Sequence, residues 1–289
     1  MLRIPALLAI LALGGHSQDF TDIKIEKVVT AGYRYTTAPA WSREGLFFAD
    51  QPANHVILWA PGRQPETYLD DAPGASGLAF DTQGRLYVSE SRARRVVRVD
   101  QKKRVQTIAE KYQGKRLNAP NDLVVRKDGN VYFTDPAFGY QEDTRELDFY
   151  GVYRITPHGE LDLVAKSSSR PHGIALAPNG RILYVSDSDL RTVRAYDLDR
   201  GGAASNERVF ARGIQGVPSG LCVDEKGDLY AAAKNIEVYA ADGKHLRTIE
   251  FGTRPSDCTF GDGDLQSLFV TAGPSIYRLR LDVKGALQY

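Results

Sequence analysis

The stretch PNDLVVRKDGNVYFTD, residues 120–135, contains two short apolar runs separated by a turn sequence. The first run, LVV, is followed by RKDGN, in which Asp and Gly favour a tight connection. The second run, VYFT, is rich in the β-branched and aromatic residues that are typical of strands. The stretch therefore predicts a β-hairpin.

The same phrase returns along the chain: a Pro or small residue, a polar residue, an apolar run, a turn with Asp or Gly, and a second apolar run. Six copies lie at residues 38–50, 75–90, 120–135, 171–187, 218–233 and 255–272. A third run with alternating apolar and polar residues follows most copies, as in GVYRITP at residues 151–157, and a weaker fourth run comes next. Each unit is therefore expected to be a four-stranded antiparallel sheet.

Successive copies start about 37 to 51 residues apart, close to the spacing of four-stranded propeller blades. We predict an all-β fold, a six-bladed β-propeller with four antiparallel strands per blade around a central channel. A single domain is expected over residues 18–289. Residues 21–30 are expected to complete the last blade and close the ring.

The first 17 residues, MLRIPALLAILALGGHS, have an early positive charge, an apolar run and small residues in that order. This order predicts a secretory signal peptide cleaved near Ser17, and hence export to the periplasm or the outside. The apolar run at residues 4–13 is too short for a permanent membrane anchor. The alternative is a buried N-terminal helix.

The formal net charge is +1, from 37 basic and 36 acidic residues, so no global field favours nucleic acid or an anionic membrane. A small-molecule substrate or ligand is expected, and no protein partner is predicted. The densest basic run is expected to be a solvated strand edge, because no aromatics interleave it; it comprises Arg92, Arg94, Arg95 and Arg98. Cys222 and Cys258 are interpreted as buried free thiols, although an exported protein could pair them.

The opening strand of each blade in a propeller lies nearest the axis, so the polar residues at its start should meet at one mouth of the channel. These ring positions are Thr37, Ser76, Asn121, His172, Ser219 and Ser256. His172 is the only imidazole among them and is predicted to be a catalytic base or acid, because imidazole titrates near neutrality. The alternative is a channel histidine that binds nothing. Ser219 is a candidate nucleophile paired with His172, but no orienting carboxylate is evident.

The other ring residues are expected to bind substrate. The Asn121 amide would hold a carbonyl oxygen or a metal, with Thr37, Ser76 and Ser256 shaping the pocket. The long segment at residues 136–153 interrupts the blade rhythm and either overhangs the mouth or packs on itself. In the first case, Phe138, Tyr140 and Phe149 form a substrate wall.

Four aspartates suggest structural roles. Asp50, Asp135 and Asp187 recur at strand ends and are interpreted as turn and blade-stitching residues. Asp122 is interpreted as a cap on neighbouring backbone N–H groups, with a second, structural ion as the alternative.

The ordered repeats resemble the regucalcin/gluconolactonase (senescence marker protein-like) family of six-bladed β-propellers. The most specific part is NAPNDLVVRKDGNVYFTDPAFGY (118–140) followed by RELDFYGVYRITPHGEL (145–161), which is similar to the bacterial gluconolactonase branch. The resemblance implies a lactonase with a divalent cation, commonly calcium, at the axis. Its ligands would be an acidic residue of the first blade, Asn residues of the third and fourth, and an Asp of the fifth. The metal would polarise the lactone carbonyl while the Asp activates water.

Carried over by position, Asn121 matches the third-blade Asn, but the other three positions depart from the pattern. Thr37, in TAPAW, stands where the family has Glu; His172 stands in place of Asn, and Ser219 in place of Asp. Without carboxylates, tight calcium binding at the ring is not expected. Asn121 and His172 could still hold a softer divalent metal.

The sequence therefore predicts a lactonase-like hydrolase of a small lactone or ester, with an altered metal centre. Two alternatives remain open. One is a propeller that binds a small polar ligand without catalysis, consistent with the loss of both carboxylates. The other is a metal-independent enzyme that uses acid/base groups only.

Overall fold

Residues 120–135 form the predicted hairpin. Strand β12 (Leu123–Val125) pairs antiparallel with β13 (Val131–Asp135), with Leu123 opposite Phe133 and Val125 opposite Val131. The structure is a computed structural model and describes residues 23–30 and 32–286. The predicted signal peptide, residues 1–17, lies outside the described residues.

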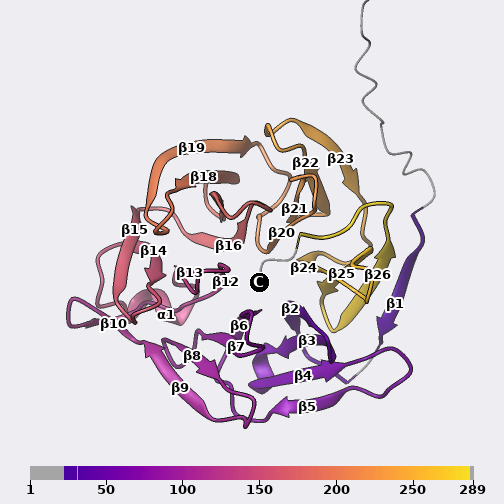
Figure 1. Cartoon of the computed structure of the whole chain (residues 1–289), viewed down its shortest axis with the longest axis horizontal. Helices are drawn as coiled ribbons and strands as arrows, with labels where there is room; N and C mark the ends of the chain where they lie inside the picture. Colours follow the sequence, from indigo (N-terminus) through magenta and orange to yellow (C-terminus); the bar gives the residue numbers. More distant parts are fainter. Residues whose placement is uncertain (1–22, 31, 287–289) are drawn as a thin grey trace, which may run out of the picture.

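Six four-stranded antiparallel sheets surround a central axis in the described chain, as Figure 1 shows, which confirms the predicted six-bladed β-propeller. Blade 1 contains β2 (Thr36–Ser42), β3 (Gly45–Asp50), β4 (His55–Trp59) and β5 (Glu66–Leu69). Blade 2 contains β6 (Ala75–Phe80), β7 (Leu86–Glu90), β8 (Arg95–Val99) and β9 (Val105–Ala109). Blade 3 contains β12 and β13 with β14 (Tyr150–Ile155) and β15 (Leu161–Ser167).

The second half of the ring repeats this order. Blade 4 contains β16 (Pro171–Leu176), β17 (Ile182–Asp187), β18 (Thr192–Leu198) and β19 (Ala204–Arg212). Blade 5 contains β20 (Leu221–Val223), β21 (Leu229–Ala232), β22 (Ile236–Tyr239) and β23 (His245–Ile249). Blade 6 contains β24 (Pro255–Gly261), β25 (Ser267–Ala272), β26 (Ser275–Arg280) and β1 (Ile25–Val29).

The ring closes with strands from both ends of the sequence. Strand β1 pairs antiparallel with β26, with Ile25 opposite Leu279 and Glu26 opposite Arg278, and the two lie side by side in Figure 1. The prediction that the segment around residues 21–30 completes the last blade is thereby confirmed for Ile25–Val29.

Short elements occupy the connections. Strands β10 (Lys111–Tyr112) and β11 (Lys115–Arg116) form a small hairpin between blades 2 and 3. The turn η1 (Gln51–Ala53) follows β3, and the one-turn helix α1 (Tyr140–Asp143) lies in the long loop of blade 3. No described helix is long and apolar enough to cross a membrane.

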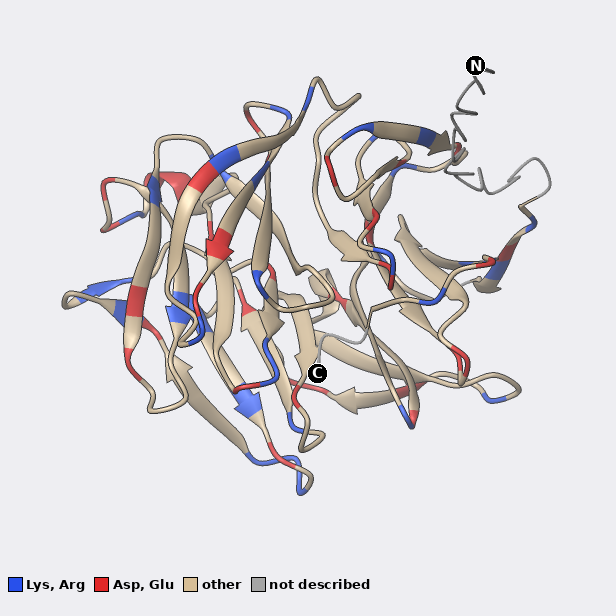
Figure 2. Cartoon of the chain, turned by 45° about the horizontal axis from the view of Figure 1, so that its top comes forward, with Lys and Arg blue, Asp and Glu red and all other residues tan. Residues whose placement is uncertain are grey.

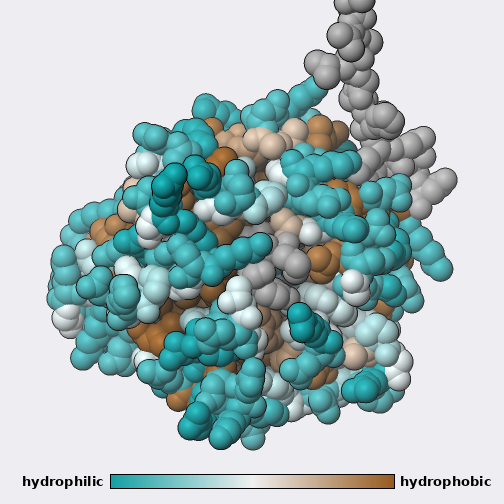
Figure 3. All heavy atoms as spheres, in the orientation of Figure 1, coloured by the Kyte–Doolittle hydropathy of each residue, from teal (hydrophilic) through white to brown (hydrophobic). Residues whose placement is uncertain are grey.

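The apolar core lies between the blades. The Phe47 ring of blade 1 meets Phe80 of blade 2 with 4.9 Å between centroids, and Trp41 of blade 1 stacks on Phe269 of blade 6 at 5.5 Å. Large aromatic side chains dominate the burial energy of such interfaces. Charged residues of both signs are interspersed over the outer strands and loops (Figure 2), and the face in Figure 3 is mainly hydrophilic with scattered apolar residues.

Glycines let the inner strands approach closely at the axis. A Cβ on Gly173 would lie 2.0 Å from the carbonyl oxygen of Ser219, and one on Gly77 would lie 2.7 Å from the carbonyl oxygen of Asn121. Both glycines directly follow a ring position, so the ring residues of adjacent blades are held near one another.

The strand-end aspartates organise connections, as predicted. Asp135 accepts the backbone N–H groups of Asn118 and Ala119, both at 2.8 Å, and so fixes the segment that leads into its own blade. Asp50 accepts the N–H groups of Arg34 and Tyr35 in the same way, and Asp187 accepts those of Asp189 and Leu190.

Candidate functional site

The residues predicted to meet at the channel mouth line one cavity of about 690 Å³. Each belongs to the inner strand of a different blade or stands two residues before it. The six are Thr37, Ser76, Asn121, His172, Ser219 and Ser256. The volume lies within the range of about 300–1,000 Å³ that is usual for small-molecule sites. The structure thus places all six together, while their chemical roles stay predictions.

The three ring serines donate their hydroxyl protons to backbone carbonyls of the next blade. Ser76 donates to Asn121 at 2.8 Å, Ser219 to Ser256 at 2.7 Å, and Ser256 to Thr36 at 2.9 Å. Thr134 and Ser186 also donate their hydroxyl protons to backbone carbonyls of the next blade. Because each hydroxyl has one proton, these serines offer a ligand only their lone pairs.

Asn121 and Thr37 differ from the serines, because their side chains make no hydrogen bond to any residue the structure describes. The backbone of Asn121 is fixed on both sides, since its N–H donates to the carbonyl of Thr134 at 2.8 Å and its carbonyl accepts the Ser76 hydroxyl. The half-buried Asn121 amide can therefore donate to, or accept from, a bound molecule from a fixed position.

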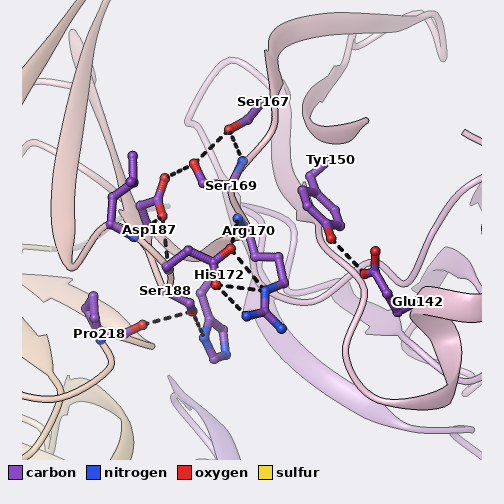
Figure 4. A network of polar contacts seen from close by, with 11 residues as sticks. Glu142, Tyr150, Ser167, Ser169, Arg170, His172, Asp187, Ser188 and Pro218 are labelled. Carbon is purple, nitrogen blue, oxygen red and sulfur yellow. Dashed lines mark hydrogen bonds and ion pairs between the residues drawn. The ribbon is translucent and has the colours of Figure 1, made fainter. Parts of the chain in front are cut away.

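His172 contacts the Ser188 hydroxyl, which in turn contacts the carbonyl of Pro218, as Figure 4 shows. Its Nδ1 lies 2.9 Å from the Ser188 hydroxyl, which itself donates to the carbonyl of Pro218 at 3.3 Å. When the Ser188 hydroxyl gives its one proton to the Pro218 carbonyl, Nδ1–H is the donor to Ser188 and Nε2 carries the lone pair. No described residue hydrogen-bonds Nε2.

The imidazole is neutral at physiological pH. Burial, and next the positive charges of Arg254 and Arg170, lower the pKa of His172 from 6.5 to about 4. A neutral ring with a free Nε2 can accept a proton but has none to give at that atom. Of the two predicted roles, base or acid, this arrangement suits the base.

The predicted nucleophile pair is not joined by a contact. His172 hydrogen-bonds Ser188, whereas the Ser219 hydroxyl donates to the carbonyls of Ser256 and, at 3.3 Å, Ala232. A serine nucleophile needs its proton directed at the base. Ser219 as a nucleophile stays a prediction that would require its hydroxyl to turn.

The long loop of blade 3 supplies part of the wall. Phe138 lies 5.1 Å from the His172 ring, and both Phe138 and the exposed Tyr140 line the cavity. Phe149 does not: its side chain is 9% exposed and packs in the apolar core beside Tyr112. Phe149 directly precedes β14, where the chain has already returned to the sheet. The prediction that Phe149 forms part of the substrate wall was therefore wrong.

Sequence reasoning missed four arginines at the mouth, which we call the arginine rim: Arg92, Arg170, Arg191 and Arg254. Arg170 pairs with Asp189 and lies over the Phe138 ring at 5.0 Å. A signal was available, because Arg170 and Arg254 each stand two residues before a ring position, in RPH and RPS.

The predicted solvated basic edge was wrong at one of its positions, Arg94, whereas Arg92 is exposed as predicted. Arg92 lines the cavity, and Arg94 is buried, where it donates to the carbonyl of Leu117 at 2.7 Å. Successive side chains of a strand and its flanking turn point to different sides of the sheet. A run of nearby arginines in the sequence therefore does not have to form one exposed edge.

The donors at the mouth do not fit a calcium ion. Across residues 23–30 and 32–286, no three His, Cys, Asp or Glu side chains are grouped as metal ligands. The ring offers one amide, one imidazole and four hydroxyls, none of them anionic, whereas calcium takes six to eight oxygen ligands, several of them anionic. The surrounding arginines repel a cation further. The softer-metal site on Asn121 and His172 stays a prediction resting on two donors.

A second, smaller cavity of about 100 Å³ lies deeper along the axis and is lined by two buried carboxyl groups. Asp122 accepts the N–H groups of Leu123 and Ile174, which confirms the predicted cap. Burial raises its pKa to about 7; burial and then the Asp122 charge raise that of Asp257 well above its usual range. Cys222 and Cys258 line the same cavity as free thiols, as interpreted from the sequence.

These carboxyls predict that the protein is more stable in mild acid than at neutral pH. Burial raises the pKa of Asp135 from 3.8 to about 7, like that of Asp122. The folded protein then binds more protons than the unfolded chain in that window, so the unfolding free energy falls as pH rises through it. A rise in carboxyl pKa from 3.8 to about 7 changes the free energy of unfolding by on the order of 4 kcal/mol.

His172 acts in the opposite direction. Its pKa is lowered from 6.5 to about 4, so its contribution to stability is lost as pH falls across that interval. One imidazole does not offset the carboxyls, and we expect the urea midpoint to fall between pH 5 and pH 8. The same pH dependence of the urea midpoint is expected in high salt, because salt screens buried groups little. A urea midpoint that rises with pH would contradict the raised carboxyl pKa values.

Comparisons with known proteins agree with the fold. The family model described as SMP-30/Gluconolactonase/LRE-like region matches residues 35–273. Gluconolactonase from Zymomonas mobilis is 33% identical over 292 residues, covering 90% of this chain and 82% of that protein.

Two solved structures share the architecture. A gluconolactonase from Xanthomonas campestris is 33% identical, with a TM-score of 0.83 and 90% of each chain covered. A calcium-binding protein, regucalcin, from Agrobacterium tumefaciens has a TM-score of 0.76 at 19% identity, covering 88% of this chain and 92% of that one. The second likeness concerns the fold alone.

Proposed function

Because this chain belongs to the SMP-30/gluconolactonase/LRE-like family, whose model spans residues 35–273, we propose that it hydrolyses a small lactone in the cavity at the mouth of its propeller. The observation that carries the proposal is the free Nε2 of His172, whose ring lines the same cavity as the unpaired amide of Asn121. A base and a donor in one pocket are the groups that ester hydrolysis needs.

The proposed reaction uses these two side chains in turn. The Asn121 amide donates a hydrogen bond to the lactone carbonyl oxygen, and His172 Nε2 takes a proton from the attacking water. The water oxygen bonds to the carbonyl carbon, and the ring C–O bond then breaks. His172 returns its proton to the leaving alkoxide, which is favourable because burial, Arg254 and Arg170 disfavour the imidazolium. The product is a hydroxy acid.

The assay is hydrolysis of a panel of sugar and aliphatic lactones, followed by proton release at fixed pH. Turnover above the spontaneous rate is expected for at least one lactone. The second candidate, a propeller that binds a polar ligand without catalysis, is favoured by Thr37 and Ser219 at the positions where the family pattern has carboxylates. Ligand-induced stabilisation with no turnover of any lactone would support that candidate.

The metal centre is proposed to be altered, with no calcium at the ring. We expect dialysis against a chelator to change the hydrolysis rate by less than about twofold, because the donor set does not match a hard cation. Elemental analysis by plasma mass spectrometry checks the same point. One divalent metal per chain that is lost in His172→Ala would overturn this expectation and make Asn121 and His172 metal ligands.

Export is part of the proposal and rests on the order of charge, apolar run and small residues in the first 17 residues. Sequencing the N-terminus of protein recovered from the periplasm or the medium tests it. A mature chain that begins near residue 18 is the expected result, and an intact N-terminus inside the cell would contradict it.

A further inference from the structure

The cavity mouth carries more positive charge than the proposed hydrolysis uses. Among the described residues, four arginines and a single acidic side chain, Asp189, line it. Asp189 is paired with Arg170 through backbone and side-chain hydrogen bonds. Glu142, close by, is already bonded to Tyr150 and paired with Arg145. Within residues 23–30 and 32–286, three of the four rim arginines are therefore without an acidic partner.

Those three arginines touch only neutral groups in the described structure. Arg92 donates to the Asn54 side chain at 2.8 Å, and Arg254 donates to the carbonyl of Val217 at 3.0 Å. The Arg191 side chain makes no hydrogen bond to a described residue. All three are exposed, so their guanidinium groups keep N–H donors for a ligand.

The three charges reach the mouth from different sides. Arg92 follows β7 of blade 2, Arg191 precedes β18 of blade 4, and Arg254 precedes β24 of blade 6. Like charges placed around a concave site focus a positive potential inside it. The formal charge of the whole chain is only +1, so this excess is a local property of the mouth.

We propose that the ligand of this cavity is anionic, carrying a carboxylate or phosphate group apart from its lactone ring. The proposal rests on the proposed function for the lactone and deepens it by naming the substrate class. Guanidinium groups bind both anions through paired N–H donors. The rings of Phe138 and Tyr140 supply an apolar surface for the uncharged part of the same molecule.

The test uses two probes that differ by one phosphate group, D-glucono-1,5-lactone and its 6-phosphate. We expect kcat/KM to be at least about tenfold higher for the phosphorylated lactone at low salt, and the advantage to shrink as salt rises. Arg191→Gln and Arg254→Gln are each expected to reduce that ratio by about tenfold. Arg181→Gln is the matched control, because Arg181 lies in the turn before β17, at the opposite end of blade 4.

A binding experiment keeps the outcome independent of turnover. Thermal shifts are measured with glucitol, gluconate and 6-phosphogluconate. Stabilisation that grows with charge and is lost in Arg191→Gln supports an anion site, even if no lactone is hydrolysed and the proposed function fails. Equal shifts with gluconate and 6-phosphogluconate mean that the rim recognises only a product carboxylate. That result, or equal kcat/KM for both lactones, overturns the inference and leaves the hydrolase standing.

Discussion

Replacing His172 with alanine is expected to lower kcat for lactone hydrolysis by about 100-fold or more, the usual contribution of a positioned general base. The substitution removes the free Nε2 and leaves water in the cavity without a proton acceptor. It should lower the melting temperature by only a few degrees, because the half-buried ring makes one side-chain hydrogen bond, to Ser188. Steady-state kinetics and thermal unfolding of the same preparation measure both effects.

The pH profile tests the same assignment without a mutation. His172 has a pKa of about 4, so it is protonated and inactive below that value and fully available above it. The kcat/KM profile should therefore rise near pH 4 and remain level through neutrality. His158→Ala is a suitable control, since His158 is an exposed turn residue outside the cavity. A limb near pH 6.5, or full activity in His172→Ala, would remove His172 from the mechanism.

Replacing Gly173 with alanine is expected to destabilise the protein by about 3 kcal/mol or more, at the upper end of overpacking costs. The new Cβ would lie 2.0 Å from the Ser219 carbonyl oxygen and 2.8 Å from the Gly220 Cα. Both are backbone atoms, so relief requires the inner strands of blades 4 and 5 to separate. Such a loss corresponds to a fall in melting temperature of about 6–12 °C for a chain of this size.

The matched control for this substitution is Gly263→Ala. Gly263 is exposed and has no atom within 4 Å of an added Cβ, so its replacement should change the melting temperature little. Differential scanning calorimetry compares the two variants. If Gly173→Ala unfolds at the same temperature as Gly263→Ala, the close approach of the inner strands is not a constraint on this fold.

The fold could be predicted from the sequence because each blade is built by local pairing. The hairpin at residues 120–135 repeats with its turn chemistry intact, so the positions after each Pro or small residue could be placed at one mouth. His172 and Asn121 were found in this way. Their contacts were not, since the bond to Ser188 depends on a turn in the same blade and on the carbonyl of Pro218 in the next.

Side-chain direction set the limit elsewhere. Ser219 looks like a free hydroxyl in the sequence, yet a carbonyl of blade 6 takes its proton at 2.7 Å. Phe138 and Phe149 are both phenylalanines of the same long loop. Phe138 lines the cavity, whereas Phe149, at the end of the loop beside β14, packs in the apolar core. Such outcomes depend on backbone groups from distant segments, which residue type alone does not encode.

The pairing of β1 with β26 has a consequence for the order of events during synthesis. Because synthesis proceeds from the N-terminus, β1 is made before every other described strand and its partner β26 after all of them. Until β26 arrives, β1 has no neighbour and blade 6 exposes an open strand edge, which is a template for aggregation. A chain that stops before Ser275–Arg280 would therefore leave both β1 and the outer edge of β25 unpaired, and we expect it to aggregate more readily than the chain described here.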